Sequence, residues 1–176
     1  MNCDEVITTT RRAWDSKMTA EEYGAFLNEL LEAERAGAKL LSAYLDELQS
    51  DSVEWKGFRD VQLDEARNCA VLIHLLLETQ ATPTFAVGTF YHRGLGIRTW
   101  RERIEFLNRG QAWVAKRLAA ALPRVPDCAR PMLQTMHDSH LSNIESCAAL
   151  LRTAVREPRA ASPESEPREV ASGNGG

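Results

Sequence analysis

The chain has 176 residues, of which 44% are hydrophobic, so its length and composition fit one compact domain. It carries 21 Lys and Arg against 25 Asp and Glu, and this net charge of −4 argues against a nucleic-acid-binding protein, which normally has a surplus of positive charge. Because residues 69–77 and the other apolar stretches are shorter than the roughly 20 residues that span a bilayer, and residues 1–10 lack a hydrophobic signal core, we expect a soluble, cytoplasmic protein that does not bind membranes.

The first half of the chain predicts two long helices. Residues 1–18 are expected to form an N-terminal extension of the folded domain. Residues 20–48 are rich in Ala, Leu and Glu, and their leucines recur at intervals of three and four, which predicts a helix with one buried face. Thr19 and Glu22 have the spacing of a capping box at its start. After a polar turn, a second helical pattern covers residues 53–78.

The second half predicts a long connection and two further helices. Residues 79–96 contain Pro83 and three glycines, so we expect a connection with one short helical turn. A third helix is predicted over residues 97–122, and a fourth begins after Asp127. Residues 157–176 have the Pro, Ser, Glu and Gly bias of a segment that cannot repay its ordering entropy, and we expect a disordered tail there.

The lengths of the connections predict the topology. Four long helices joined by short, long and short connections predict an all-α, four-helix bundle over residues 19–156. The connection over residues 79–96 is long enough to travel the length of the bundle, so the second and third helices can run in parallel. The alternative is a simple up-and-down bundle with a decorated loop.

Polar residues on the apolar helix faces mark the candidate site, because burying them costs free energy unless they find partners. On helical wheels, four such residues lie near the helix midpoints, and helices in register bring them to one layer: Glu34, Glu65, Gln111 and His140. His137 lies one turn away on the same face of the fourth helix. Carboxylates and imidazoles that converge in an apolar bundle suit iron, manganese or zinc. The alternative is a hydrogen-bonded network without metal, in which Glu34 and His140 form an ion pair.

Four segments carry a family resemblance. LLEAERAG and DEARNC in the first two helices, with ERIEFLNRGQAWVAKRL and MHDSHLSNIE in the last two, resemble the ferritin-like superfamily and an uncharacterised bacterial branch of it, over residues 20–152. The resemblance implies a ferritin-like bundle with a long crossover between the second and third helices. It also implies a metal site in which helices one and three each give a Glu and helices two and four each give Glu-x-x-His. Glu34 and Glu65 fit the carboxylates of the first two helices, and the fourth helix offers His137-x-x-His140 where Glu-x-x-His is expected. The candidate metal residues are therefore Glu34, Glu65, His137 and His140.

The sequence departs from this pattern in ways that bear on function. Asn68 stands where the second helix should give His, and the third helix offers either Glu105 or Gln111. Two carboxylates leave most of the charge of a di-iron centre uncompensated, so we expect one metal ion, iron or manganese, or none. If the protein is an enzyme, the resemblance implies an iron-dependent oxidoreductase. The alternative is a metal-free helical module that forms a homodimer or binds a partner. The sequence identifies no small-molecule substrate.

The cysteines predict reduced thiols rather than a structural framework. The four residues include no Cys-x-x-Cys pair, and their spacing fits neither a disulfide scaffold nor a zinc ribbon. Cys69 and Cys147 fall on the core faces of their helices, where we expect them to act as small apolar residues.

Overall fold

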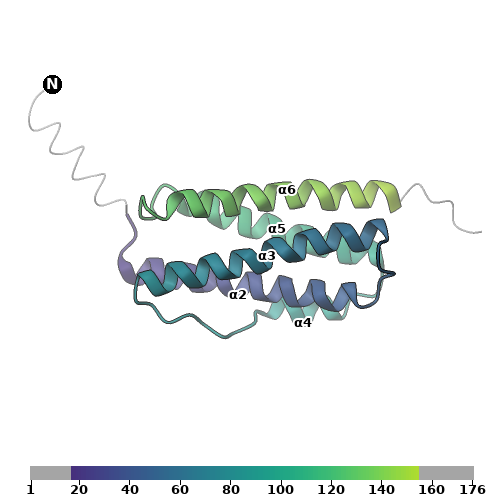
Figure 1. The fold of residues 1–176 in the computed structure, drawn as a ribbon, viewed down its shortest axis with the longest axis horizontal. Coiled ribbons are helices and arrows are strands. Elements are labelled where there is room, and N and C mark those ends of the chain that lie inside the picture. Colours follow the sequence, from purple (N-terminus) through teal and green to yellow (C-terminus); the bar gives the residue numbers. More distant parts are fainter. Residues whose placement is uncertain (1–16, 155–176) are drawn as a thin grey trace, which may run out of the picture.

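The computed structural model describes residues 17–154, and within this range all the regular secondary structure is helical (Figure 1). The helices are α2 (Ala20–Leu45), α3 (Val53–Glu78), α4 (Thr89–Leu95), α5 (Trp100–Ala121) and α6 (Arg130–Ala154). The predicted tail and all but the last two residues of the predicted N-terminal extension lie outside the described residues. None of the helices described combines the length and the apolar character needed to cross a membrane.

Local sequence signals set most of the helix ends. The capping box predicted at the start of α2 is present, because the Thr19 side chain accepts from the backbone of Glu22 and the Glu22 side chain accepts from the backbone of Thr19. The bounds of α3 are those predicted. The first helix ends at Leu45 rather than residue 48, and the third begins at Trp100 rather than residue 97, because the Thr99 side chain caps it by accepting from the backbone of Glu102.

Helices α3 and α5 run in the same direction, as the long connection predicted. Trp100 at the start of α5 lies against Phe58 near the start of α3, with ring centroids 4.6 Å apart. Near the middle of both helices, Gln111 donates a hydrogen bond to Glu65. Figure 1 shows the connection returning along the bundle from the end of α3 to the start of α5.

The crossover is attached to α2 by specific hydrogen bonds. The Asn28 side chain donates to the carbonyl of Thr82 over 3.1 Å and accepts from the backbone N–H of Thr84 over 2.7 Å. Further along, the Tyr44 hydroxyl donates to the carbonyl of Gly94 over 2.8 Å, which fixes the short helix α4 against α2. These bonds decide which side chains of α4 face the bundle.

The core consists of two apolar clusters with a polar layer between them. The first contains, among others, Leu27, Leu31, Leu72, Leu76, Val114, Leu118, Leu133 and Met136. The second contains, among others, Leu40, Leu41, Phe58, Val61, Ile104, Leu107, Cys147 and Leu150. In every long helix, the residues that separate the two clusters include buried polar ones, so the layer crosses the bundle at one level.

Candidate functional site

All four long helices contribute to the polar layer. It consists of six buried side chains: Glu34 from α2, Glu65 and Asn68 from α3, Gln111 from α5, and His140 and Asn143 from α6. Each is no more than 7% exposed. Groups of this polarity are stable at such depth only when their hydrogen bonds are satisfied by one another or by a ligand.

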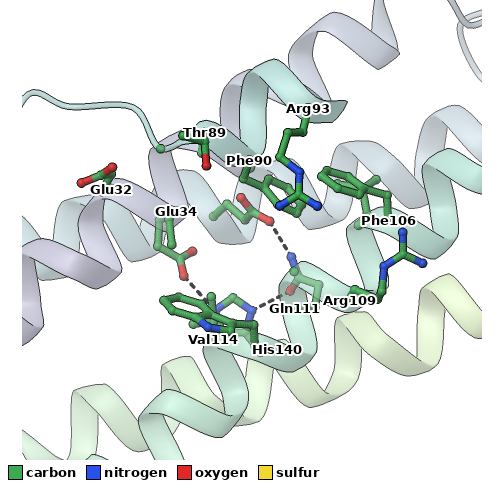
Figure 2. A pocket seen from close by; sticks show the side chains of 18 of the residues that line it. Glu32, Glu34, Thr89, Phe90, Arg93, Phe106, Arg109, Gln111, Val114 and His140 are labelled. Carbon is green, nitrogen blue, oxygen red and sulfur yellow. Dashed lines mark hydrogen bonds and ion pairs between the residues drawn. The ribbon is translucent and has the colours of Figure 1, made fainter. Parts of the chain in front are cut away.

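A chain of hydrogen bonds links the two carboxylates through His140 and Gln111, as the dashed lines in Figure 2 show. His140 Nε2 lies 2.9 Å from Glu34 Oε1, and His140 Nδ1 lies 2.6 Å from Gln111 Oε1. The amide nitrogen of Gln111 donates to Glu65 Oε1. Both ring nitrogens of His140 therefore face oxygen acceptors, an arrangement that suits an imidazolium paired with the Glu34 carboxylate.

The two asparagines complete the network. Asn68 Nδ2 donates to Glu34 Oε2 over 3.0 Å, so each oxygen of that carboxylate has a partner. Asn143 Nδ2 lies 3.5 Å from Gln111 Oε1. Asn68 stands where the ferritin-like pattern has a histidine, and here it acts as a hydrogen-bond donor to the carboxylate.

Glu65 is the member of the layer whose hydrogen bonding is incomplete. Its Oε2 atom is buried and has no hydrogen-bond partner among the described residues. Burial raises the pKa of the Glu65 carboxyl well above its usual value, and the negative charge of Glu34 raises it further, against the opposing effect of the hydrogen bond from Gln111. Both effects shift the Glu65 carboxyl group toward its protonated form, which can donate a hydrogen bond as well as accept one.

A pocket of about 600 Å³ leads from the surface to this layer. At its floor lie Glu34, Glu65, Gln111 and His140, one from each long helix, and the rest of its lining comes from α2, α5, α4 and the residue before α4 (Figure 2). Nearer the surface, α4 contributes Phe90 and Arg93, while α5 contributes Phe106, Arg109 and Trp113. The crossover thus completes a site whose floor is made by the four long helices.

The family profile described as "Domain of unknown function (DUF6306)" matches residues 21–149, which is more than half of the chain and includes the whole polar layer. The chain belongs to the DUF6306 family. No curated protein and no solved structure matched it. The ferritin-like resemblance stays a prediction, because the DUF6306 match does not bear on it.

The DUF6306 structure brings together three of the four predicted metal residues, Glu34, Glu65 and His140, around Gln111. It places His137 elsewhere. The His137 side chain is half-buried and lies 3.0 Å from Asp138, with Gln134 as a second partner. Because Leu133, Met136 and His140 hold the core-facing positions of α6, His137 lies at the edge of the helix and is not part of the pocket lining.

The layer as it stands is a hydrogen-bonded network rather than an assembled metal centre. Among residues 17–154, no group of three or more His, Cys, Asp or Glu side chains is placed to hold one. Both nitrogens of His140 and both oxygens of Glu34 already have partners, whereas Glu65 Oε2 has none among the described residues. Binding a metal would require the DUF6306 network to exchange its internal hydrogen bonds for coordination, so metal binding stays a prediction.

Several parts of the site were not found from the sequence. They are Asn143, the pocket with its lining from α4, and Gly37, which lies against the Glu65 carboxylate. A signal was available for Gly37. It follows Glu34 by three residues on the same helix face, and a glycine on the buried face of an otherwise strong helix marks a close approach.

Proposed function

We propose that this bundle is a binding module for a small organic molecule, which occupies the pocket above the polar layer. The observation that carries the proposal is Glu65, which lines a pocket of about 600 Å³ and has a buried oxygen, Oε2, without a hydrogen-bond partner among the described residues. Leaving such a group unpaired costs about 1–3 kcal/mol. A ligand in the pocket that hydrogen-bonds to the Glu65 carboxyl group would recover that cost.

The size and lining of the pocket agree with this function. Small-molecule sites commonly have volumes of about 300–1,000 Å³ and combine apolar walls with a few polar groups that orient the ligand. Here Phe90, Phe106 and Val114 supply apolar surface, while Glu65 and Gln111 supply the polar groups at the floor. The hydrogen bonds of Gln111 to two neighbours hold that floor in place before a ligand arrives.

The experiment is a ligand-observed NMR screen of a mixed library of small molecules, with a variant that blocks the pocket. Thr89 is exposed at the start of α4 and lines the pocket, so Thr89→Trp should fill the entrance without disturbing the core. Thr82→Trp is the matched control, because Thr82 is exposed on the same crossover but does not line the pocket. We expect hits that bind the wild type and Thr82→Trp and are lost in Thr89→Trp. Hits that bind all three proteins equally would refute the proposal.

A ferritin-like bundle that binds one iron or manganese ion through Glu34, Glu65 and His140 is the second candidate. Two buried carboxylates in one layer, one of them with a free oxygen, support it. As an enzyme, such a protein would be an iron-dependent oxidoreductase. This candidate ranks second because both ring nitrogens of His140 already have hydrogen-bond partners within the layer.

Metal analysis separates the two candidates. Protein purified from medium containing iron, manganese and zinc, and then supplemented with each, should hold no stoichiometric metal at pH 7.5 if the layer is a pocket floor. Stoichiometric metal that is lost on Glu34→Gln or Glu65→Gln, with the fold retained by circular dichroism, would reverse the ranking, because these changes remove an anionic donor and preserve shape.

A further inference from the structure

We infer that the ligand of this pocket is a planar molecule with a single negative charge, such as an aromatic monocarboxylate, whose anionic group lies on the side of the pocket lined by Arg93 and Arg109. The inference rests on the proposed function and identifies the chemical class that the pocket accepts.

The two arginines are the first observation. Their guanidinium carbons lie 5.8 Å and 5.7 Å from the centroid of the Phe106 ring, so both charges flank this ring of the pocket lining (Figure 2). Within the described part of the chain, neither makes a hydrogen bond or an ion pair, whereas Arg101 and Arg103 of the same region pair with glutamates. Guanidinium groups bind carboxylates with two parallel hydrogen bonds, and both of these remain available for a ligand.

An aromatic wall lies beside these charges. The rings of Phe90 and Phe106 stack with centroids 4.2 Å apart and an interplanar angle of 15°. Gly110 permits this contact, because a Cβ at that position would lie 2.7 Å from Phe90 Cζ. Trp113 also lines the pocket and is 44% exposed. Flat apolar surfaces of this kind favour a planar ligand over a branched one.

The other charges around the pocket limit the ligand to one negative charge. Glu29 forms an ion pair with Arg117, so its charge is compensated. Glu32 has no ion-pair partner among residues 17–154 and lies on the opposite side of the view in Figure 2 from Arg93 and Arg109. At the floor, Glu34 is paired with His140, and the raised pKa of Glu65 shifts it toward its neutral form. Nearer the surface, two positive charges and one negative charge leave an excess of one positive charge, which matches a monoanion better than a phosphate monoester or a polyanion.

The experiment measures the affinity of benzoate, 4-hydroxybenzoate, benzamide and phenyl phosphate by NMR titration. Each carboxylate should bind at least about tenfold more tightly than benzamide, which has the same shape without the charge, and more tightly than phenyl phosphate. The double substitution Arg93→Gln/Arg109→Gln should lower benzoate affinity to that of benzamide and leave benzamide unchanged. Arg98→Gln is the control, because Arg98 is exposed but does not line the pocket, and it should have no effect.

The outcomes separate this inference from the proposed function. If Thr89→Trp abolishes binding but the arginine variant binds both carboxylates as the wild type does, the pocket is a binding site and the inference about charge is wrong. Three other results would also overturn the inference about charge. They are equal affinity for benzoate and benzamide, tighter binding of phenyl phosphate than of the carboxylates, and no binding of either carboxylate at millimolar concentration. If the carboxylates bind Thr89→Trp as tightly as the wild type, the proposed function itself has failed.

Discussion

The carboxylate of Glu65 lies directly on the backbone of Gly37. A Cβ built on Gly37 would be 1.8 Å from Glu65 Oε2 and 2.5 Å from the carboxyl carbon, distances that no side chain tolerates. The absence of a side chain at residue 37 is therefore what allows a buried carboxyl group to sit between α2 and α3, at the floor of the pocket.

Gly37→Ala should destabilise the protein by about 1–3 kcal/mol, because Glu65 must leave its place and give up the hydrogen bond from Gln111. In a Glu65→Ala background the same substitution should stabilise by up to about 1 kcal/mol, because the clash is gone and Ala is the better helix former. Chemical denaturation of the wild type, the two single variants and the double variant measures both effects. The same sign in the two backgrounds would show that the contact between these residues is not the cause.

Glu65→Gln should change how stability depends on pH. The folded-state pKa of Glu65 is raised above its unfolded value near 4.5, so its contribution to stability is fully present below that pH and is lost as the pH rises through the folded value. Gln has the shape of the protonated acid and does not titrate. We expect the variant to match the wild type near pH 4 and to be the more stable protein at pH 8. Denaturation series at several pH values test this, and a difference that does not grow with pH would contradict it.

The buried pair of Glu34 and His140 should show strong energetic coupling. Each side chain is 1% exposed, and His140→Leu leaves the Glu34 charge with Asn68 as its remaining partner, a change that should cost about 3–5 kcal/mol. The cost should fall when Glu34→Gln is already present, because no buried charge is then left uncompensated. A double-mutant cycle by urea denaturation at pH 7 measures the coupling. Additive effects of the two substitutions would exclude an ion pair.

Cysteine reactivity should differ sharply between positions. Burial raises the pKa of the Cys69 thiol to about 12, with Glu34 and Glu65 adding to the effect, and burial with Glu65 raises that of Cys147 to about 11. Cys128 is exposed. At pH 7.5, iodoacetamide should therefore label Cys128 in the native protein and leave the other two unlabelled until denaturant is added, because the thiolate is the reactive form. Peptide mass spectrometry reports each site, and rapid native labelling of Cys69 would be inconsistent with the packing described.

The sequence by itself determined the helices and much of the layer. Helix propensity, the capping box and the three-to-four spacing of apolar residues are local properties, so the bounds of α3 and the start of α2 follow from them. Wheels also assigned Glu34, Glu65, Gln111 and His140 to buried faces, because the helical repeat fixes which side of a helix a residue occupies. The length of the crossover predicted that α3 and α5 run in parallel.

The tertiary structure decided which of these groups bond to one another and what lies above them. The partners of His140 depend on the rotation of four helices about their axes, which no single helix determines. Phe90 and Arg93 reach the pocket because hydrogen bonds from Asn28 and Tyr44 place the crossover, and these bonds join residues about 50 or more positions apart in the chain. Local periodicity carries information about a few turns of helix. The pocket is made by contacts between distant segments, so it exists only once the chain has packed.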